Sequence, residues 1–300
     1  MDERLVHKYI SFVDEISNIY QYDGNIKHLL YLIVPAFVTK YTIYKESLIL
    51  NTFRNVPIMI SHENNDIIQA FYTSIPQHVE DKIVTKKYVV LKNYNRVSLV
   101  QLLDNLVHEF NHAVNSYQKE ILIKDNTLYL RTGLSYAKYD VNNLEAISKD
   151  DSYILEEILN THQTEEIINY IKNYHDRERI EFNHTVDAIN HETDDKYKSS
   201  AYYLENTLMR DILNNKTFIS TLNNLRITGD ILDISDWFNH ITGDNDSYQK
   251  LIQYLKEIMN LEEKYSTQKF FKNRTIEKIK DYIRKIMNII DTFNQNCNYK

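Results

Sequence analysis

Two histidines four residues apart, with a glutamate directly after the first, lie in the stretch LVHEFNHAVNS at residues 106–116. Successive residues of an α-helix turn by about 100°, so His108 and His112 would face the same side, about 6 Å apart, and could bind one metal ion. Glu109 would lie on the neighbouring flank, where a carboxylate can take a proton from a water molecule without being a ligand. The spacing therefore predicts a zinc site with a general base beside it.

The surroundings of this pair indicate a buried helix. A helix that holds a metal inside a protein needs uncharged neighbours, because an unpaired buried charge is costly. The neighbouring positions meet this condition: Phe110, Asn111, Ala113 and Val114. The alternative is a buried polar cluster whose groups bond one another without a metal.

The segment HEFNH resembles the HExxH signature of the zincin metallopeptidases. The metzincin branch continues with a glycine at position 115 and a histidine at position 118, whereas this chain has Asn115 and Gln118. The gluzincin branch instead takes a glutamate from a later helix as the third ligand. The resemblance therefore implies a gluzincin-like, zinc-dependent metallopeptidase with an α+β catalytic domain, in which a small mixed sheet accompanies the metal-binding helix.

A third ligand is available in YILEEILNTHQTEEI, residues 153–167. In gluzincin segments that resemble this one, two mostly apolar positions and then a polar residue follow the ligand acid. That pattern favours Glu157, and Glu156 is the reserve candidate. The alternative is an acidic helix face in solvent, but the uncharged polar run at residues 160–164 favours a polar cleft.

The residue that orients a ligand histidine stays open. Many gluzincins carry an aspartate four residues after the ligand glutamate, where it holds a ligand histidine from outside the metal sphere. This chain has Thr161 at that position. The candidates are therefore Asp104, Asn160 and Thr161.

The resemblance also implies a mechanism. Zinc lowers the pKa of a water molecule towards about 7, and Glu109 would take its proton and pass it to the leaving amine of a peptide bond. Gluzincins stabilise the developing oxyanion with a Tyr, His or Arg downstream of the third ligand. The candidates here are Tyr202, Tyr203 and Arg210, with ordinary helix packing as the alternative for each.

A peptide substrate is expected to bind as an extended strand along a sheet edge. Zincins place such a strand before the metal helix, which favours KKYVVLKNY, residues 86–94, as the edge. Gly133, in LRTGLS, could form a cleft wall, although the end of a plain hairpin is the preferred interpretation.

The elements that must position these residues follow from hydrophobic periodicity. Apolar residues at helical spacing predict a helix within the first 25 residues and another over 26–39. Four short segments rich in β-branched and aromatic residues predict strands: SLILNTF, VPIMIS, AFYTSI and KKYVVLKNY. The motif helix should begin after Ser98, its N-cap, and run to about Lys119. A hairpin at the DN of ILIKDNTLYL and a helix over 152–174 should follow.

From about residue 176 the pattern is almost entirely helical and more polar. We therefore expect a zincin-like catalytic domain at residues 1–175 and a helical subdomain at residues 176–300 that walls the cleft. His184 and His191 lie in a segment dense with charge, and solvated surface is the expectation for both.

Composition limits the remaining possibilities. The formal net charge of −7, from 42 acids and 35 bases, argues against nucleic acid or an anionic membrane as a partner. The single cysteine, Cys297, excludes an intrachain disulfide and leaves histidines and carboxylates to hold any metal. The most apolar window, residues 28–38, is too short for a membrane span. The acidic amino terminus lacks the features of a secretory signal, so a cytoplasmic location is expected, with export by a route without a signal peptide left open.

These observations favour a zinc metallopeptidase that acts on peptides or proteins. One alternative is a non-catalytic, zinc-stabilised interaction protein that binds a partner protein through its helical C-terminal region. The other is a metal-free helical interaction module.

Overall fold

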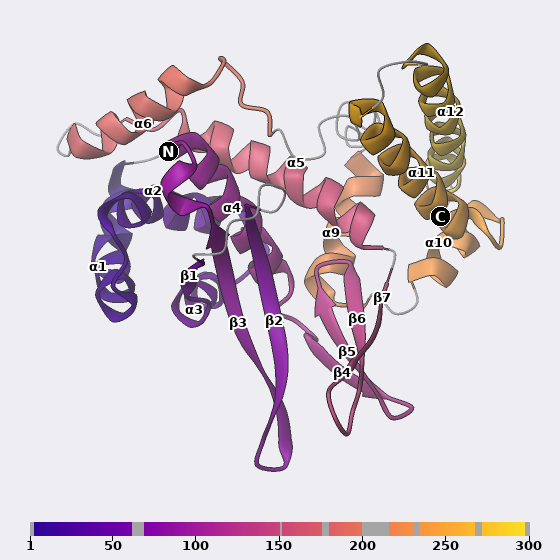
Figure 1. The fold of residues 1–300 in the computed structure, drawn as a ribbon, viewed down its shortest axis with the longest axis horizontal. Coiled ribbons are helices and arrows are strands. Elements are labelled where there is room, and N and C mark those ends of the chain that lie inside the picture. Colours follow the sequence, from indigo (N-terminus) through magenta and orange to yellow (C-terminus); the bar gives the residue numbers. More distant parts are fainter. Residues whose placement is uncertain are drawn as a thin grey trace. The chain divides into compact units, whose positions relative to one another are not determined.

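The computed structural model describes residues 3–61, 69–150, 152–175, 180–199, 216–230, 234–267 and 272–297. In these residues the chain is mixed α+β, with two small sheets and a helical C-terminal region (Figure 1). Its internal contacts divide it into two units, Met1–Val114 with Gln163–Ser199, and Asn115–His162 with Ser200–Lys300. The boundaries between these units fall after residues 114, 162 and 199, and the domain boundary expected at residue 175 stays a prediction.

The first unit begins with three helices, α1 (Glu3–Tyr20), α2 (Gly24–Lys40) and α3 (Glu46–Asn55). Asp23 caps α2 by accepting a hydrogen bond from the amide of Ile26 at 3.0 Å. The segment SLILNTF was expected to be a strand, and that prediction is wrong because it lies in α3. Its buried residues are spaced for one helical face: Ile49, Thr52 and Phe53.

The sheet of the first unit comprises β1 (Ile58–Ser61), β2 (Ala70–Val79) and β3 (Lys82–Lys92) in the order β1-β3-β2. β3 pairs in parallel with β1 and antiparallel with β2. β3 contains most of residues 86–94, so the expectation that this segment forms the sheet edge is wrong. Its hydrogen bonds to strands on both sides make it the central strand, and β2 is an edge.

The metal-motif helix is α4 (Leu99–Asn115), which follows the short 3₁₀ helix η1 (Tyr94–Arg96). The amide of Gln101 donates to Ser98 Oγ at 3.2 Å, so Ser98 is the expected N-cap. α5 (Tyr153–Ile171) and α6 (Ile180–Glu192) follow later in the chain. The ring of Phe182, on α6, lies 5.1 Å from that of Tyr31, on α2. This packing explains why residues 180–199 belong with the amino-terminal helices.

The sheet of the second unit is an antiparallel meander of β4 (Ile121–Lys124), β5 (Thr127–Thr132), β6 (Ser135–Asp140) and β7 (Ala146–Lys149). Asp125 and Asn126 join β4 to β5 with φ angles of 50° and 59°, as a two-residue type I′ hairpin turn requires. The expected hairpin at DN is confirmed. Gly133 lies in the next hairpin turn, between β5 and β6, with a φ of 57°. The preferred interpretation, that this glycine lies at the end of a plain hairpin, is confirmed.

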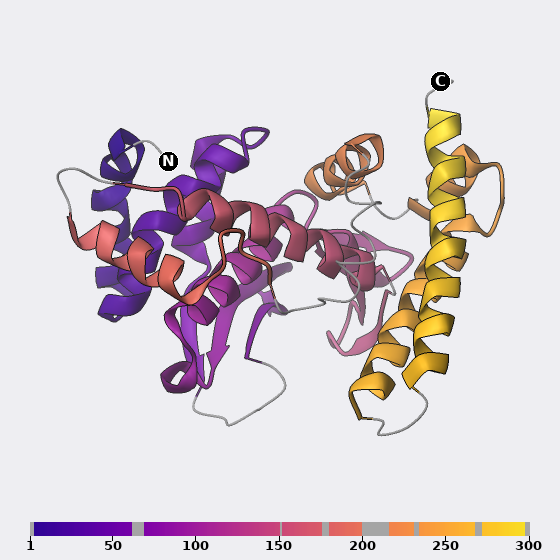
Figure 2. The ribbon, with the colours of Figure 1, turned by 90° about the horizontal axis from the view of Figure 1, so that it is seen from above.

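The helices of the second unit are α9 (Lys216–Thr228), α10 (Ile234–Thr242), α11 (Ser247–Thr267) and α12 (Lys272–Cys297). α11 and α12 pack side by side in opposite directions (Figures 1 and 2). The hydrophobic core of the second unit includes a stacked pair of rings, Phe238 on α10 and Phe293 on α12, whose centres are 5.0 Å apart. Among the described helices, none combines the length and apolar character needed to cross a membrane.

The N-cap of α4 provides a test of the fold. We expect Ser98→Ala to lower the free energy of unfolding by about 1 kcal/mol, because the amide of Gln101 loses its acceptor. Urea unfolding measures the change. Ser98→Asp is the matched control and should retain the stability, and equal midpoints for Ser98→Ala and wild type would contradict the capping role.

Candidate metal centre

Hydrogen bonds between buried polar side chains join α4 to the carboxyl-terminal half of α5. The amide nitrogen of Asn111 donates to Thr164 Oγ1 at 3.0 Å. The hydroxyl of Tyr41 lies 2.5 Å from Asn111 Oδ1 and 2.9 Å from Gln163 Oε1. Such bonds between buried groups have narrow geometry, so they fix which faces of α4 and α5 are turned towards each other.

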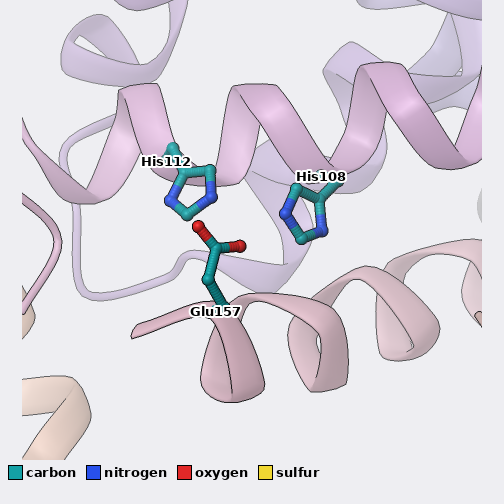
Figure 3. Close-up of side chains that lie close together, drawn as sticks. All are labelled: His108, His112 and Glu157. Atoms are coloured by element: carbon teal, nitrogen blue, oxygen red, sulfur yellow. The ribbon is translucent and has the colours of Figure 1, made fainter. Parts of the chain in front are cut away.

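The same face of α5 carries the expected third ligand. Glu157 precedes Thr164 by seven residues, which is two helical turns and returns it to the same side. The ligand atoms of His108, His112 and Glu157 all lie within 4.8 Å of one another. Figure 3 shows both imidazoles directed towards the Glu157 carboxylate. Zn–N and Zn–O bonds of about 2.0–2.2 Å place two ligand atoms on one tetrahedral ion about 3.4 Å apart, so the group would contract to hold one ion.

The adjacent glutamate has a different environment. Glu156 is 1% exposed, and its carboxylate accepts hydrogen bonds from Arg226 Nη2 at 2.6 Å and Arg226 Nε at 2.8 Å. It also accepts one from the amide of Leu134 at 2.8 Å. The reserve candidate for third ligand is therefore engaged in a buried ion pair, and Glu157 is the acid that joins the histidines.

Glu109 is buried, with 7% of its surface exposed, and its Oε2 accepts a hydrogen bond from the amide of Tyr72 at 2.6 Å. Tyr72 lies on β2 opposite Val89. The amide of Val89 donates to Pro57, on the β1 side of β3. Tyr72 and Val89 therefore do not bond each other, and the Tyr72 amide points away from β3. Glu109 thus lies at the outer edge of β2.

Asp104, one turn before His108 on α4, is the candidate best placed to orient a ligand histidine. Its Oδ2 accepts a hydrogen bond from Ser199 Oγ at 3.1 Å. Burial raises the pKa of Asp104, and the neighbouring His108 and the hydroxyls of Tyr197 and Ser199 oppose this rise. Burial is also the main reason that the pKa of Tyr197 is raised. Sequence reasoning did not single out Tyr197 and Ser199, which lie in the polar stretch after α6.

The other two candidates for this orienting role have different surroundings. Asn160 Oδ1 lies 3.4 Å from Arg226 Nη2, so its side chain faces the ion pair of Glu156. Thr161 Oγ1 is buried and has no hydrogen-bond partner among the described residues.

The expected oxyanion donors Tyr202, Tyr203 and Arg210 lie outside the described residues. His184 and His191 are exposed on α6, as expected for solvated surface.

Replacing Asp104 tests its orienting role. We expect Asp104→Ala to weaken zinc binding by about 10- to 100-fold, which is the usual effect of losing a group that holds a ligand histidine. Competition with a chromophoric chelator measures the dissociation constant. Ser199→Ala, which leaves the carboxylate in place, should have a smaller effect. Unchanged affinity in a folded Asp104→Ala protein would rule out this role.

No family model matches the chain, and neither a curated protein nor a solved structure matches it.

Proposed function

We propose that the chain is a zinc-dependent metallopeptidase of the gluzincin-like type. The observation that carries this proposal is the group formed by His108, His112 and Glu157, whose ligand atoms lie within 4.8 Å of one another. Glu109 follows the first of these histidines directly and is buried. Two imidazoles, one carboxylate and an adjacent acid that is not a ligand are the parts that metal-assisted peptide hydrolysis requires.

The donor set suits zinc. Imidazole nitrogen and carboxylate oxygen are both ordinary zinc ligands. Among the described residues, the group contains three such donors and no fourth histidine, cysteine or acid. Structural zinc sites usually close all four positions with protein ligands, whereas catalytic sites use three. This count favours a catalytic metal over the zinc-stabilised interaction protein.

Glu109 would be the general base. When bound, Zn²⁺ would supply Lewis acidity, which makes water a nucleophile near neutral pH and polarises the scissile carbonyl. The carboxylate of Glu109 would accept the proton of the attacking water and deliver it to the nitrogen of the leaving amine. The Tyr72 amide holds Oε2 of this carboxylate at 2.6 Å and so restricts its orientation.

The proposed substrate-binding surface is the outer edge of β2, the edge that does not pair with β3. Backbone amides and carbonyls of an antiparallel strand alternate in direction, so Ala70, Tyr72 and Ser74 direct theirs away from β3. A peptide that pairs with this edge would pass beside Glu109, and it would not bond the Tyr72 amide, because that amide already donates to Glu109. An extended backbone is the form in which an edge strand binds a peptide.

Pro76 marks how far such pairing can extend. It belongs to the same outward-facing set as Tyr72 and Ser74, and it has no amide proton to donate. Proline within a sheet is confined to positions where no ladder bond is lost. Towards the carboxyl end of β2, the last amide that could donate a hydrogen bond to a substrate before Pro76 is therefore that of Ser74.

The roles of base and ligand can be separated by substitution. Glu109→Gln should keep the zinc and lower the rate of peptide hydrolysis by about 10²- to 10⁴-fold, because proton transfer is lost. Glu157→Ala and His112→Ala should lose the metal. Elemental mass spectrometry of the purified proteins measures zinc per chain, and digestion of a peptide library measures hydrolysis.

Glu166→Ala is the matched control for Glu157→Ala, because it removes an exposed acid from the same helix. It should bind zinc like the wild type. Two results would contradict the proposed function. One is a wild-type chain that holds no zinc after incubation with excess metal, and the other is a Glu109→Gln protein that hydrolyses peptides at the wild-type rate.

The β2 edge has its own test. Ser74→Pro removes one outward amide, so we expect KM for a cleaved peptide to rise by up to about tenfold, the value of one backbone hydrogen bond. Ser74→Ala keeps the amide and serves as the control. If both variants have the wild-type KM and zinc content, substrate does not pair with this part of β2.

A further inference from the structure

The hairpin turn between β5 and β6 is tied to both ligand helices. The amide of Gly133 donates to Ser116 Oγ at 3.1 Å, and Ser116 directly follows α4, four residues after His112. The amide of Leu134 donates to Glu156 Oε2 at 2.8 Å, and Glu156 directly precedes Glu157. One turn therefore contacts the end of the histidine helix and the residue beside the third ligand.

The carboxylate at this turn is held by an arginine from the helical C-terminal region. Arg226, on α9, makes a two-point contact with Glu156, and the side chains are 0% and 1% exposed. A fork-shaped guanidinium on a carboxylate fixes orientation as well as distance. Arg131 adds a second buried cation, whose Nη1 donates to the carbonyl of Arg226 at 2.8 Å and to that of Gly133 at 2.6 Å.

Gly133 gives the carboxylate its space. A Cβ atom at this position would lie 2.0 Å from the carboxyl carbon of Glu156, and the residue has a φ of +57°. Any larger residue would displace Glu156 from the turn. We call the group formed by Ser116, Arg131, Gly133, Glu156 and Arg226 the brace.

Stability alone is a weak reason for a buried ion pair. The cost of removing both charges from water offsets much of their attraction, and apolar replacements of the whole pair are often neutral. What such a pair supplies is a defined geometry. Here that geometry is imposed on α5 at the residue next to Glu157.

We propose that the Glu156–Arg226 pair is a positioning device for the metal centre: through the brace it holds Glu157 at the distance from His112 that metal binding requires. This inference rests on the proposed function, because it assumes that the three-residue group binds zinc. It makes α9, which begins 45 residues after α5 ends, a determinant of metal affinity.

The test compares full-length wild type with the double variant Glu156→Met/Arg226→Met, which replaces both charges with apolar groups of similar length. Zinc affinity is measured by chelator competition, and the visible spectrum of the Co²⁺-loaded protein reports coordination geometry. We expect a folded protein with zinc affinity lowered about 10- to 100-fold and an altered Co²⁺ spectrum. A role in stability alone would leave the spectrum unchanged.

Two further variants complete the experiment. Arg226→Lys keeps the charge but loses the fork, so it should also weaken zinc binding, and it replaces the double variant if that protein does not fold. Asp230→Asn is the matched control, since it breaks the exposed ion pair with Lys119, which is not part of the brace, and it should bind zinc like the wild type.

The outcomes separate the two proposals. If the wild type takes up zinc and the folded brace variants match it in affinity and Co²⁺ spectrum, the positioning role is wrong and the proposed function stands. If the wild type takes up no metal, the proposed function fails and the positioning role falls with it.

Discussion

The hydrogen bond between Asn111 and Thr164 is the constraint on which the candidate site depends. Apolar contacts alone specify the rotation of a helix less sharply than polar ones, because the hydrophobic effect has no direction. A buried side-chain hydrogen bond removes that freedom. With Asn111 and Thr164 joined, the helical period turns His108 and His112 on α4 and Glu157 on α5 to the sides on which the two helices face each other.

The buried faces of α4 and α5 are unusually polar for a protein core. Asp104, Glu109, Asn111 and His112 on α4 and Glu156, Asn160, Thr161 and Thr164 on α5 are all buried. Each such group costs free energy unless it is bonded. The partners identified here are specific: Ser199 for Asp104, Tyr72 for Glu109 and Arg226 for Glu156. The polar strip is thus a set of oriented groups, as a site for chemistry requires and a core built only for stability does not.

The parts of the fold that local chemistry determines could be predicted from the sequence. The N-cap at Ser98, the turn at Asp125 and Asn126 and the face shared by His108 and His112 depend on neighbouring residues only. Segment 47–53 was misassigned because a short apolar run fits both periods, and here the helical one buries Ile49 and Phe53. The edge strand was also misassigned, although Pro76 within β2 was a local signal that this strand lies at an edge.

The resemblance to gluzincin segments favoured Glu157 over Glu156, but helical geometry alone could not separate the two acids, because adjacent helical residues differ only by a rotation of about 100°. Which of them faces the histidines is decided by the rotation of α5, and that rotation is set by residues far away in the chain. Thr164 bonds Asn111, 53 residues earlier, and Glu156 bonds Arg226, 70 residues later. Two adjacent glutamates therefore have different environments. Glu156 is neutralised by Arg226, whereas Glu157 faces two imidazoles. In the proposed site, the ion pair of Glu156 with Arg226 therefore identifies Glu157 as the acid available to a metal.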